Sequence, residues 1–126
     1  MDFEAKIAEL GLLIPKPAKP AGSYKPCVIV DNIAYISGQG PLLEDGSFAK
    51  GKVGADVDLK TAQNHARLCG LAILSALKNE IGSINKVDQL IKLTGFVNSI
   101  ESFIQQPLVI NGCSNMMKDI FGETGV

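Results

Sequence analysis

The element that decides the fold is a long helix predicted over residues 58–80, with the sequence DLKTAQNHARLCGLAILSALKNE. Its apolar side chains recur at steps of three and four residues, which gathers them on one buried helical face. They are Leu59, Ala62, Ala66, Cys69, Ala72, Ile73, Ala76 and Leu77. Asp58 is suited to cap the first turn, and Asn79 and Gly82 bracket the predicted end.

Short β-branched runs upstream of this helix predict strands. Residues 27–30 and 33–37 flank Asp31-Asn32, a pair with turn chemistry, so we predict a β-hairpin. A weaker third strand is expected within residues 48–53, where lysines and Gly51 reduce the strand signal.

The N-terminal region is expected to form a unit of its own. Phe3, Ile7 and Leu10 have helical spacing, and Gly11 ends that pattern. Three prolines between residues 15 and 20 then predict an extended connector. We therefore divide the chain into residues 1–22, a helix and proline-rich connector, and residues 23–126, the main domain.

The sequence after the long helix predicts one more strand and one more helix. Residues 87–97 form the strand candidate, and Ser102 is suited to cap a helix that runs to Phe121. The predicted class is α+β, with a leading helix followed by the order β-β-β-α-β-α. A strand that joins a sheet after a helix requires a crossover, so we expect a mixed sheet with both helices on one face. The other face would then need cover from another subunit.

Composition excludes several classes of function. The formal net charge is −1 and Arg67 is the only arginine, so the basic excess of nucleic-acid binders is missing. One histidine and three dispersed cysteines cannot form a Cys/His zinc set, so no metal is expected. No window is long enough for a membrane span. The odd cysteine count and charged N-terminus favour reduced thiols in a cytoplasmic protein.

Several local motifs could carry chemistry, but each of them favours a structural role. Residues 46–52 approach a P-loop, but Val53 stands where a hydroxyl should bind Mg²⁺, which favours a solvated turn. His65 lacks an identifiable partner, so a structural or surface role is preferred to catalysis. Cys113 is preferred as a small core residue rather than a nucleophile. The weak helix formers of residues 111–115 predict tight packing against another element or chain.

Two stretches of the sequence resemble a known family. Residues 35–41, YISGQGP, with Ser23-Tyr24 before them and Gly46 and residues 51–54 after them, resemble the N-terminal signature of RidA/YjgF proteins. Residues 93–98, LTGFVN, followed by Phe103, look like that family's fourth strand and its exit into the second helix. Residues 106–112 are similar to a subgroup with a longer N-terminus. The family is also called L-PSP endoribonuclease-like.

The resemblance implies a fold and an activity. The fold would be chorismate-mutase-like, assembled as a homotrimer with three clefts between subunits. These clefts would bind small carboxylates, 2-oxo acids above all, and active members would hydrolyse reactive enamines and imines to 2-oxo acids and ammonia. No cofactor is implied. The alternatives are a non-catalytic protein that binds a small carboxylate in the same pocket and, less favoured, a ribonuclease.

The site residues carried over by position are Tyr24, Ser37, Gly38, Gln39 and Phe96. They are assigned to ligand binding, and no residue is assigned to catalysis. Tyr24 would wall the pocket and orient ligand or water. Ser37, with the Gly38 and Gln39 backbone, would offer hydrogen bonds at an approach that only glycine allows, and Phe96 would form an apolar wall.

Two departures from the family pattern bear on the substrate. The family's C-terminal strands, one with an arginine that binds the ligand carboxylate, would follow Phe121, and we expect them to be missing from a C-terminally truncated domain. In addition, Gly40 stands where many members have isoleucine, which predicts a larger or differently shaped pocket. Both departures favour metabolite binding over a specific chemistry.

Overall fold

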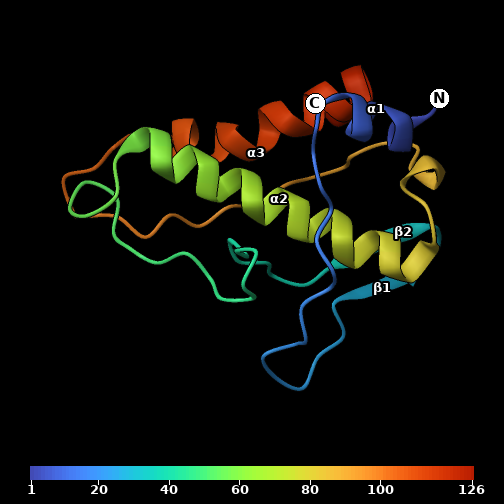
Figure 1. Ribbon diagram of the computed structural model, residues 1–126, viewed down its shortest axis with the longest axis horizontal. Coiled ribbons are helices and arrows are strands. Elements are labelled where there is room, and N and C mark those ends of the chain that lie inside the picture. Colours follow the sequence, from blue (N-terminus) through green and yellow to red (C-terminus); the bar gives the residue numbers. More distant parts are fainter.

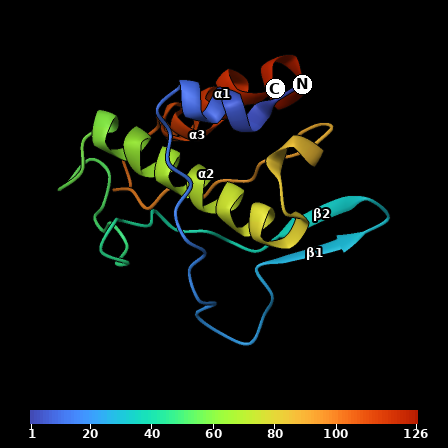
Figure 2. The same ribbon diagram turned by 45° about the vertical axis from the view of Figure 1, so that its right-hand side comes forward.

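A computed structural model describes residues 1–126 as helices packed over a small β-hairpin (Figure 1). The long helix α2 lies in the middle, with α1 and α3 on one side of it and the hairpin on the other (Figure 2). In chain order the elements are α1 (Phe3–Glu9), β1 (Cys27–Val30), β2 (Ile33–Ile36), α2 (Leu59–Ile81), the 3₁₀ turn η1 (Ile84–Lys86), α3 (Gln106–Phe121) and the 3₁₀ turn η2 (Gly122–Gly125).

The predicted long helix is confirmed, including both of its ends. Asp58 accepts a hydrogen bond from the Thr61 N–H at 2.8 Å, which satisfies one of the free donors of the first turn. Gly82 ends the helix with φ of +88°, a conformation that glycine adopts without strain. The helix is therefore limited at each end by the residue that the sequence indicated.

The core lies between α2 and α3, and glycines let the two helices approach closely. At Gly112 a Cβ atom would lie 2.7 Å from the carbonyl carbon of Gln63, so only a hydrogen fits there. At Gly70 it would lie 2.8 Å from the Cys113 sulfur. The small residues of 111–115 thus serve tight packing within the chain, as the sequence indicated. Phe3 and Ile7 of α1 belong to the same core.

The hairpin forms as predicted. Asp31 and Asn32 have φ of +49° and +63°, the left-handed conformations required at both central positions of a tight two-residue turn. Cys27 pairs with Ile36, and Val28 pairs with Tyr35. Because successive side chains of a strand alternate between faces, one face of the hairpin is directed to α2 and the other remains open. The open face is apolar and consists of Val28, Val30, Ile33 and Tyr35.

The two other predicted strands are not formed, so the sheet has two antiparallel strands and is not mixed. In residues 48–53, Phe48 makes one bridge to Leu42, and Val53 makes isolated bridges to Val57 and Ser99. Residues 87–97 run past α2 and α3 without a neighbouring strand, and Leu90 N–H donates to the Thr124 carbonyl instead. A run of apolar residues forms a strand only where a neighbouring backbone offers N–H and C=O groups for the hydrogen bonds of the sheet.

The last helix and its placement also differ from the prediction. It begins at Gln106, not after Ser102, and Pro107 lies in its first turn, where a missing N–H costs least. Only α2 contacts the hairpin, whereas α3 packs on the far side of α2, so the two helices do not cover one sheet face together. Ile110 of α3 lies against Gly95 of the extended segment.

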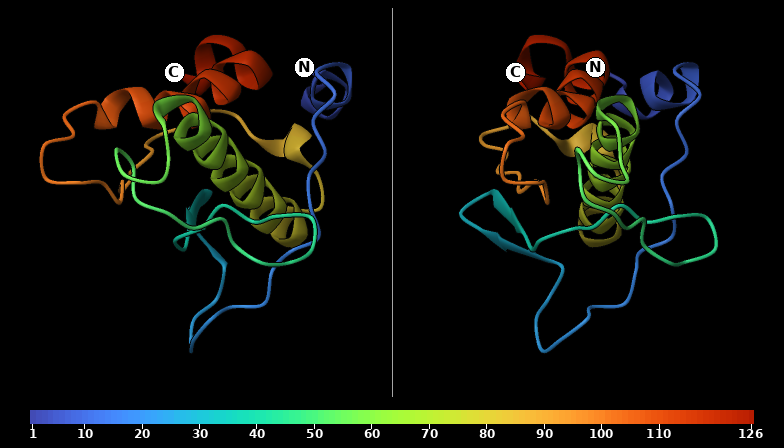
Figure 3. Two further views of the ribbon diagram at one scale, coloured as in Figure 1. Left: turned by 60° about the vertical axis from the view of Figure 1, so that its left-hand side comes forward. Right: turned by 90° about the vertical axis from the view of Figure 1, so that its left-hand side faces the viewer.

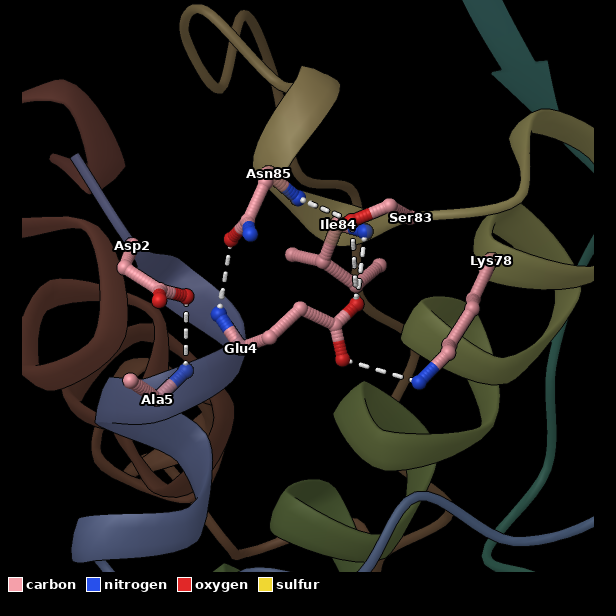
Figure 4. A network of polar contacts seen from close by, with 7 residues as sticks. All are labelled: Asp2, Glu4, Ala5, Lys78, Ser83, Ile84 and Asn85. Carbon is pink, nitrogen blue, oxygen red and sulfur yellow. Dashed lines mark hydrogen bonds and ion pairs between the residues drawn. The ribbon is translucent and has the colours of Figure 1, made fainter.

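A polar network attaches the N-terminal helix to the rest of the chain (Figure 4). The Glu4 carboxylate accepts a hydrogen bond from the Ile84 N–H and pairs with the Lys78 ammonium, both at 2.8 Å. Asn85 accepts from the Glu4 N–H at 2.9 Å. The Lys78 hydrogen bond is the main reason that the pKa of Glu4 lies below its usual value. On the apolar side, the rings of Phe3 and Phe121 pack edge to face at 4.8 Å.

Candidate functional site

The candidate site is a cavity of about 70 Å³ where the proline-rich connector passes the loop that follows β2. In both views of Figure 3 these two stretches cross next to α2. The floor is the α2 surface formed by Ala72, Ser75 and Ala76. The remaining lining residues are Lys16, Pro17, Ala18, Lys19, Pro20, Ala21, Tyr24, Pro26, Gly38, Gln39, Gly40, Leu42 and Phe48.

The connector is positioned by hydrogen bonds at both ends of this cavity. Ser75 is 3% exposed, and its hydroxyl donates to the Pro15 carbonyl at 2.6 Å. At the other end, the Ser37 N–H donates to the Pro26 carbonyl at 2.9 Å. Proline has no N–H donor but keeps its carbonyl as an acceptor, and both carbonyls are used here. The connector is therefore a fixed wall of the cavity.

Tyr24 folds back onto the connector. Its hydroxyl oxygen accepts from the Ala21 N–H at 3.1 Å, and its ring lies against Gly22. With that lone pair in use, the phenol O–H is still able to donate to a ligand. Tyr24 thus has the geometry for the ligand- or water-orienting role that the sequence suggested.

The loop after β2 presents Gly38, Gln39 and Gly40 to the cavity. The Gln39 amide donates to the Ser37 carbonyl at 3.2 Å, which holds its side chain beside the strand end. A Cβ at Gly40 would lie 2.9 Å from the Phe48 ring, so that ring occupies the space an isoleucine would need. The Phe48 ring therefore fills the space beside Gly40, and the larger or differently shaped pocket expected from Gly40 stays a prediction.

Three of the five predicted site residues line this one cavity, and two do not. Tyr24, Gly38 and Gln39 face it together. The Ser37 hydroxyl donates to the Lys25 carbonyl at 2.6 Å and braces the entry of β1. Phe96 lies on the extended segment with its side chain 94% exposed. A Cβ added at Gly38 would have no atom within 4 Å. Close packing within the chain therefore does not explain why glycine stands at this position.

Sequence reasoning missed the two lysines of the connector. Lys16 and Lys19 line the cavity, while no aspartate or glutamate does. Neither ammonium has a carboxylate within 4 Å, because the ion pairs of the chain are those of Lys6 and Lys78. The sequence analysis predicted only a linker for residues 15–20. The sequence Lys-Pro-Ala-Lys could have indicated a rigid, positively charged stretch.

The other candidates for chemistry are located outside this cavity. His65 is half-buried on α2 and makes no side-chain hydrogen bond. Cys113 is buried between α2 and α3, and burial raises the pKa of its thiol to about 11. This thiol is protonated at neutral pH, in keeping with a core role. No three side chains of His, Cys, Asp or Glu gather as metal ligands.

The fold and the site define an α+β protein with one long helix over a hairpin and a small cavity beside the strand end. The chain belongs to the family described as "YjgF/chorismate mutase-like, putative endoribonuclease", whose model matches residues 4–126. This agrees with the resemblance read from residues 35–41 and 93–98.

Three proteins from other organisms are similar to this chain. It is 34% identical over 119 residues to Protein TCP17 of Trypanosoma cruzi, covering 94% of this chain and 74% of that protein. A Shewanella oneidensis MR-1 structure with the same endoribonuclease description aligns with a TM-score of 0.95 at 31% identity, over 100% of this chain and 83% of that one. Protein Atu1372 of Agrobacterium tumefaciens, of unknown function, aligns with a TM-score of 0.86 at 42% identity, over 98% and 74% respectively.

None of the helices combines the length and hydropathy needed to cross a membrane.

Proposed function

We propose that this protein hydrolyses reactive enamines and imines to 2-oxo acids and ammonia, in a pocket completed by a second subunit. The observation that supports this most directly is the convergence of Tyr24, Gly38 and Gln39 on one small cavity. Pockets for drug-sized ligands measure roughly 300–1,000 Å³, so a cavity of about 70 Å³ suits only a small metabolite.

The reaction asks little of such a site. An enamine takes a proton at carbon to become an imine, water adds to the C=N carbon, and the resulting carbinolamine expels ammonia to leave a 2-oxo acid. A site accelerates this by holding the carboxylate and placing water beside the carbon. The free O–H of Tyr24 and the Gln39 amide are the groups suited to orient that water.

A shared pocket is supported by apolar surface that this chain leaves open. Phe96 is almost fully exposed, and the open hairpin face presents Tyr35 at 58% exposure beside three β-branched residues. Contiguous apolar surface of this kind marks contact with another protein. We propose a homotrimer in which Phe96 walls a neighbour's cleft. Multi-angle light scattering that found a stable monomer at micromolar concentration would remove Phe96 from the site.

The test uses 2-aminoacrylate generated in situ by a serine dehydratase. We expect the protein to accelerate release of pyruvate and ammonia beyond the buffer rate, and Tyr24→Phe to reduce that acceleration. Lys118→Gln on α3 serves as the control, because Lys118 is exposed and lies on the far side of α2 from the hairpin. Equal pyruvate release with and without the protein would disprove the hydrolytic activity.

One observation favours the alternative of a non-catalytic carboxylate-binding protein. The cavity lining contains no carboxylate and no histidine, so no side chain of this chain is an obvious general base. That alternative predicts thermal stabilisation by a 2-oxo acid without turnover. Ribonuclease activity is less favoured, because the lining offers neither histidine nor arginine.

A further inference from the structure

The connector brings two positive charges to the cavity, and their surroundings leave both charges free. Lys16 and Lys19 stand on either side of Pro17-Ala18, where proline restricts the backbone. No acidic residue lines the cavity, and no carboxylate lies within 4 Å of either ammonium. A small cavity with cationic lining and no compensating anion favours a negatively charged ligand.

The lysines are held at the cavity by buried structure. Ser75 is the one buried polar residue of the core, and its hydroxyl bonds the Pro15 carbonyl, the residue directly before Lys16. A buried hydroxyl that is fully committed to one backbone carbonyl fixes the path of the connector over α2. On the other side of Lys19, the bond between Tyr24 and Ala21 closes the connector back on itself. The lysine backbones are therefore fixed, while the long side chains can still adjust to a ligand.

The neutral lining matches the other end of a small acid. The Tyr24 O–H and the Gln39 amide are polar lining groups, and the Phe48 ring together with Ala72 and Ala76 supplies an apolar surface. A 2-oxo acid has a charged carboxylate, a polar carbonyl or imine group, and a short apolar side chain. Each of these parts meets a lining group of the corresponding kind.

We propose that Lys16 and Lys19 bind the carboxylate of the 2-oxo acid or its imine, so that the connector provides the cationic side of the site. This inference rests on the proposed function and names the residues that hold the substrate. It assigns to the N-terminal segment the carboxylate-binding role that the family resemblance implies for an arginine.

The experiment titrates pyruvate and 2-oxobutanoate into the protein and follows ligand NMR line broadening. We expect the double variant Lys16→Gln/Lys19→Gln to bind pyruvate about 10-fold more weakly, since two exposed charges act through a high dielectric. The charge-keeping variant Lys16→Arg/Lys19→Arg should retain binding. Lys118→Gln should bind pyruvate as tightly as the wild type does. Pyruvamide, which lacks the negative charge, should bind to the wild type about as weakly as pyruvate binds to the double Gln variant.

The outcomes separate this inference from the proposed function. Equal pyruvate affinity in the wild type and the Gln variant would overturn the role of the lysines and leave the proposed function standing. Lysine-dependent binding without hydrolysis of 2-aminoacrylate would support the role of the lysines and remove the enzyme activity. A wild type that binds neither acid would overturn both. Because both lysines are exposed, the variants should unfold at the same temperature as the wild type. This measurement checks that a loss of binding does not come from unfolding.

Discussion

The substitution Gly112→Ala tests the close approach of α2 and α3. The new Cβ would lie 2.7 Å from the Gln63 carbonyl carbon and 2.8 Å from its Cα, with the carbonyl oxygen closer still. Carbon atoms in van der Waals contact are about 3.5–4.0 Å apart, so the helices must separate by roughly 1 Å. Both sides of the clash are backbone and cannot rotate away.

The expected free-energy change combines two opposing effects. Overpacking costs about 1–3 kcal/mol where side chains can shift, and we place a backbone clash at about 3–4 kcal/mol. Replacing glycine by alanine inside a helix returns about 1 kcal/mol. The net loss is about 2–3 kcal/mol, which in a chain of this size lowers the unfolding temperature by about 10 °C.

The assay is thermal unfolding followed by far-UV circular dichroism, which suits a chain without tryptophan. Gly38→Ala is the matched control, because its Cβ has open space and its φ is not positive, so the change should be within about 0.5 kcal/mol. Gly70→Ala should cost less than Gly112→Ala, because the two atoms nearest to its Cβ belong to side chains, the flexible tip of Met116 and the Cys113 sulfur, and not to the backbone of the other helix. A Gly112→Ala protein as stable as the wild type would refute the close-approach argument.

Three other predictions concern charge, thiols and assembly. Because the folded state lowers the pKa of Glu4 below 4.5, the stability that Glu4 provides is present above pH 4.5 and is lost as the pH falls through the folded value. In urea titrations, Glu4→Gln should lower the free energy of unfolding by about 1 kcal/mol at pH 7 and leave it unchanged at pH 2. The value at pH 7 is small because the Lys78 side chain is 44% exposed and solvent screens the ion pair. Thiol titration with Ellman's reagent at pH 7 should show little reaction until urea unfolds the chain, since burial raises the pKa of all three thiols, and fast labelling of the native protein would contradict this. Tyr35→Lys should lower the mass found by light scattering while leaving the circular dichroism spectrum intact, whereas an unchanged mass would place the subunit contact elsewhere.

Local signals in the sequence predicted the elements that depend on local chemistry. The cap Asp58, the terminator Gly82 and the turn Asp31-Asn32 each determine their own backbone within a few residues, and all three appear in the structure. The residues of the cavity that flank β2, Gly38 and Gln39, came from the family resemblance and do line it together with Tyr24.

The predictions that failed depended on distant partners. Residues 87–97 have strand composition, but no second strand pairs with them in the structure. Lys16 and Lys19 were missed because a proline-rich stretch looks the same in sequence whether it is free or held by a serine 60 positions further on. Phe96 was assigned to a pocket wall; within one chain nothing covers it, and its place in a pocket stays a prediction.

The hydrogen bond from Ser75 to Pro15 also bears on the order of folding. It joins residues 60 positions apart, so the connector docks only after that long loop closes, whereas α2 forms from neighbouring residues. One wall of the cavity is therefore completed only after this loop has closed. A ligand that needs this wall binds only the docked fraction of molecules, and its measured affinity is reduced by that fraction. Weakening the hydrogen bond between Ser75 and Pro15 would therefore lower the affinity for every ligand that needs this wall.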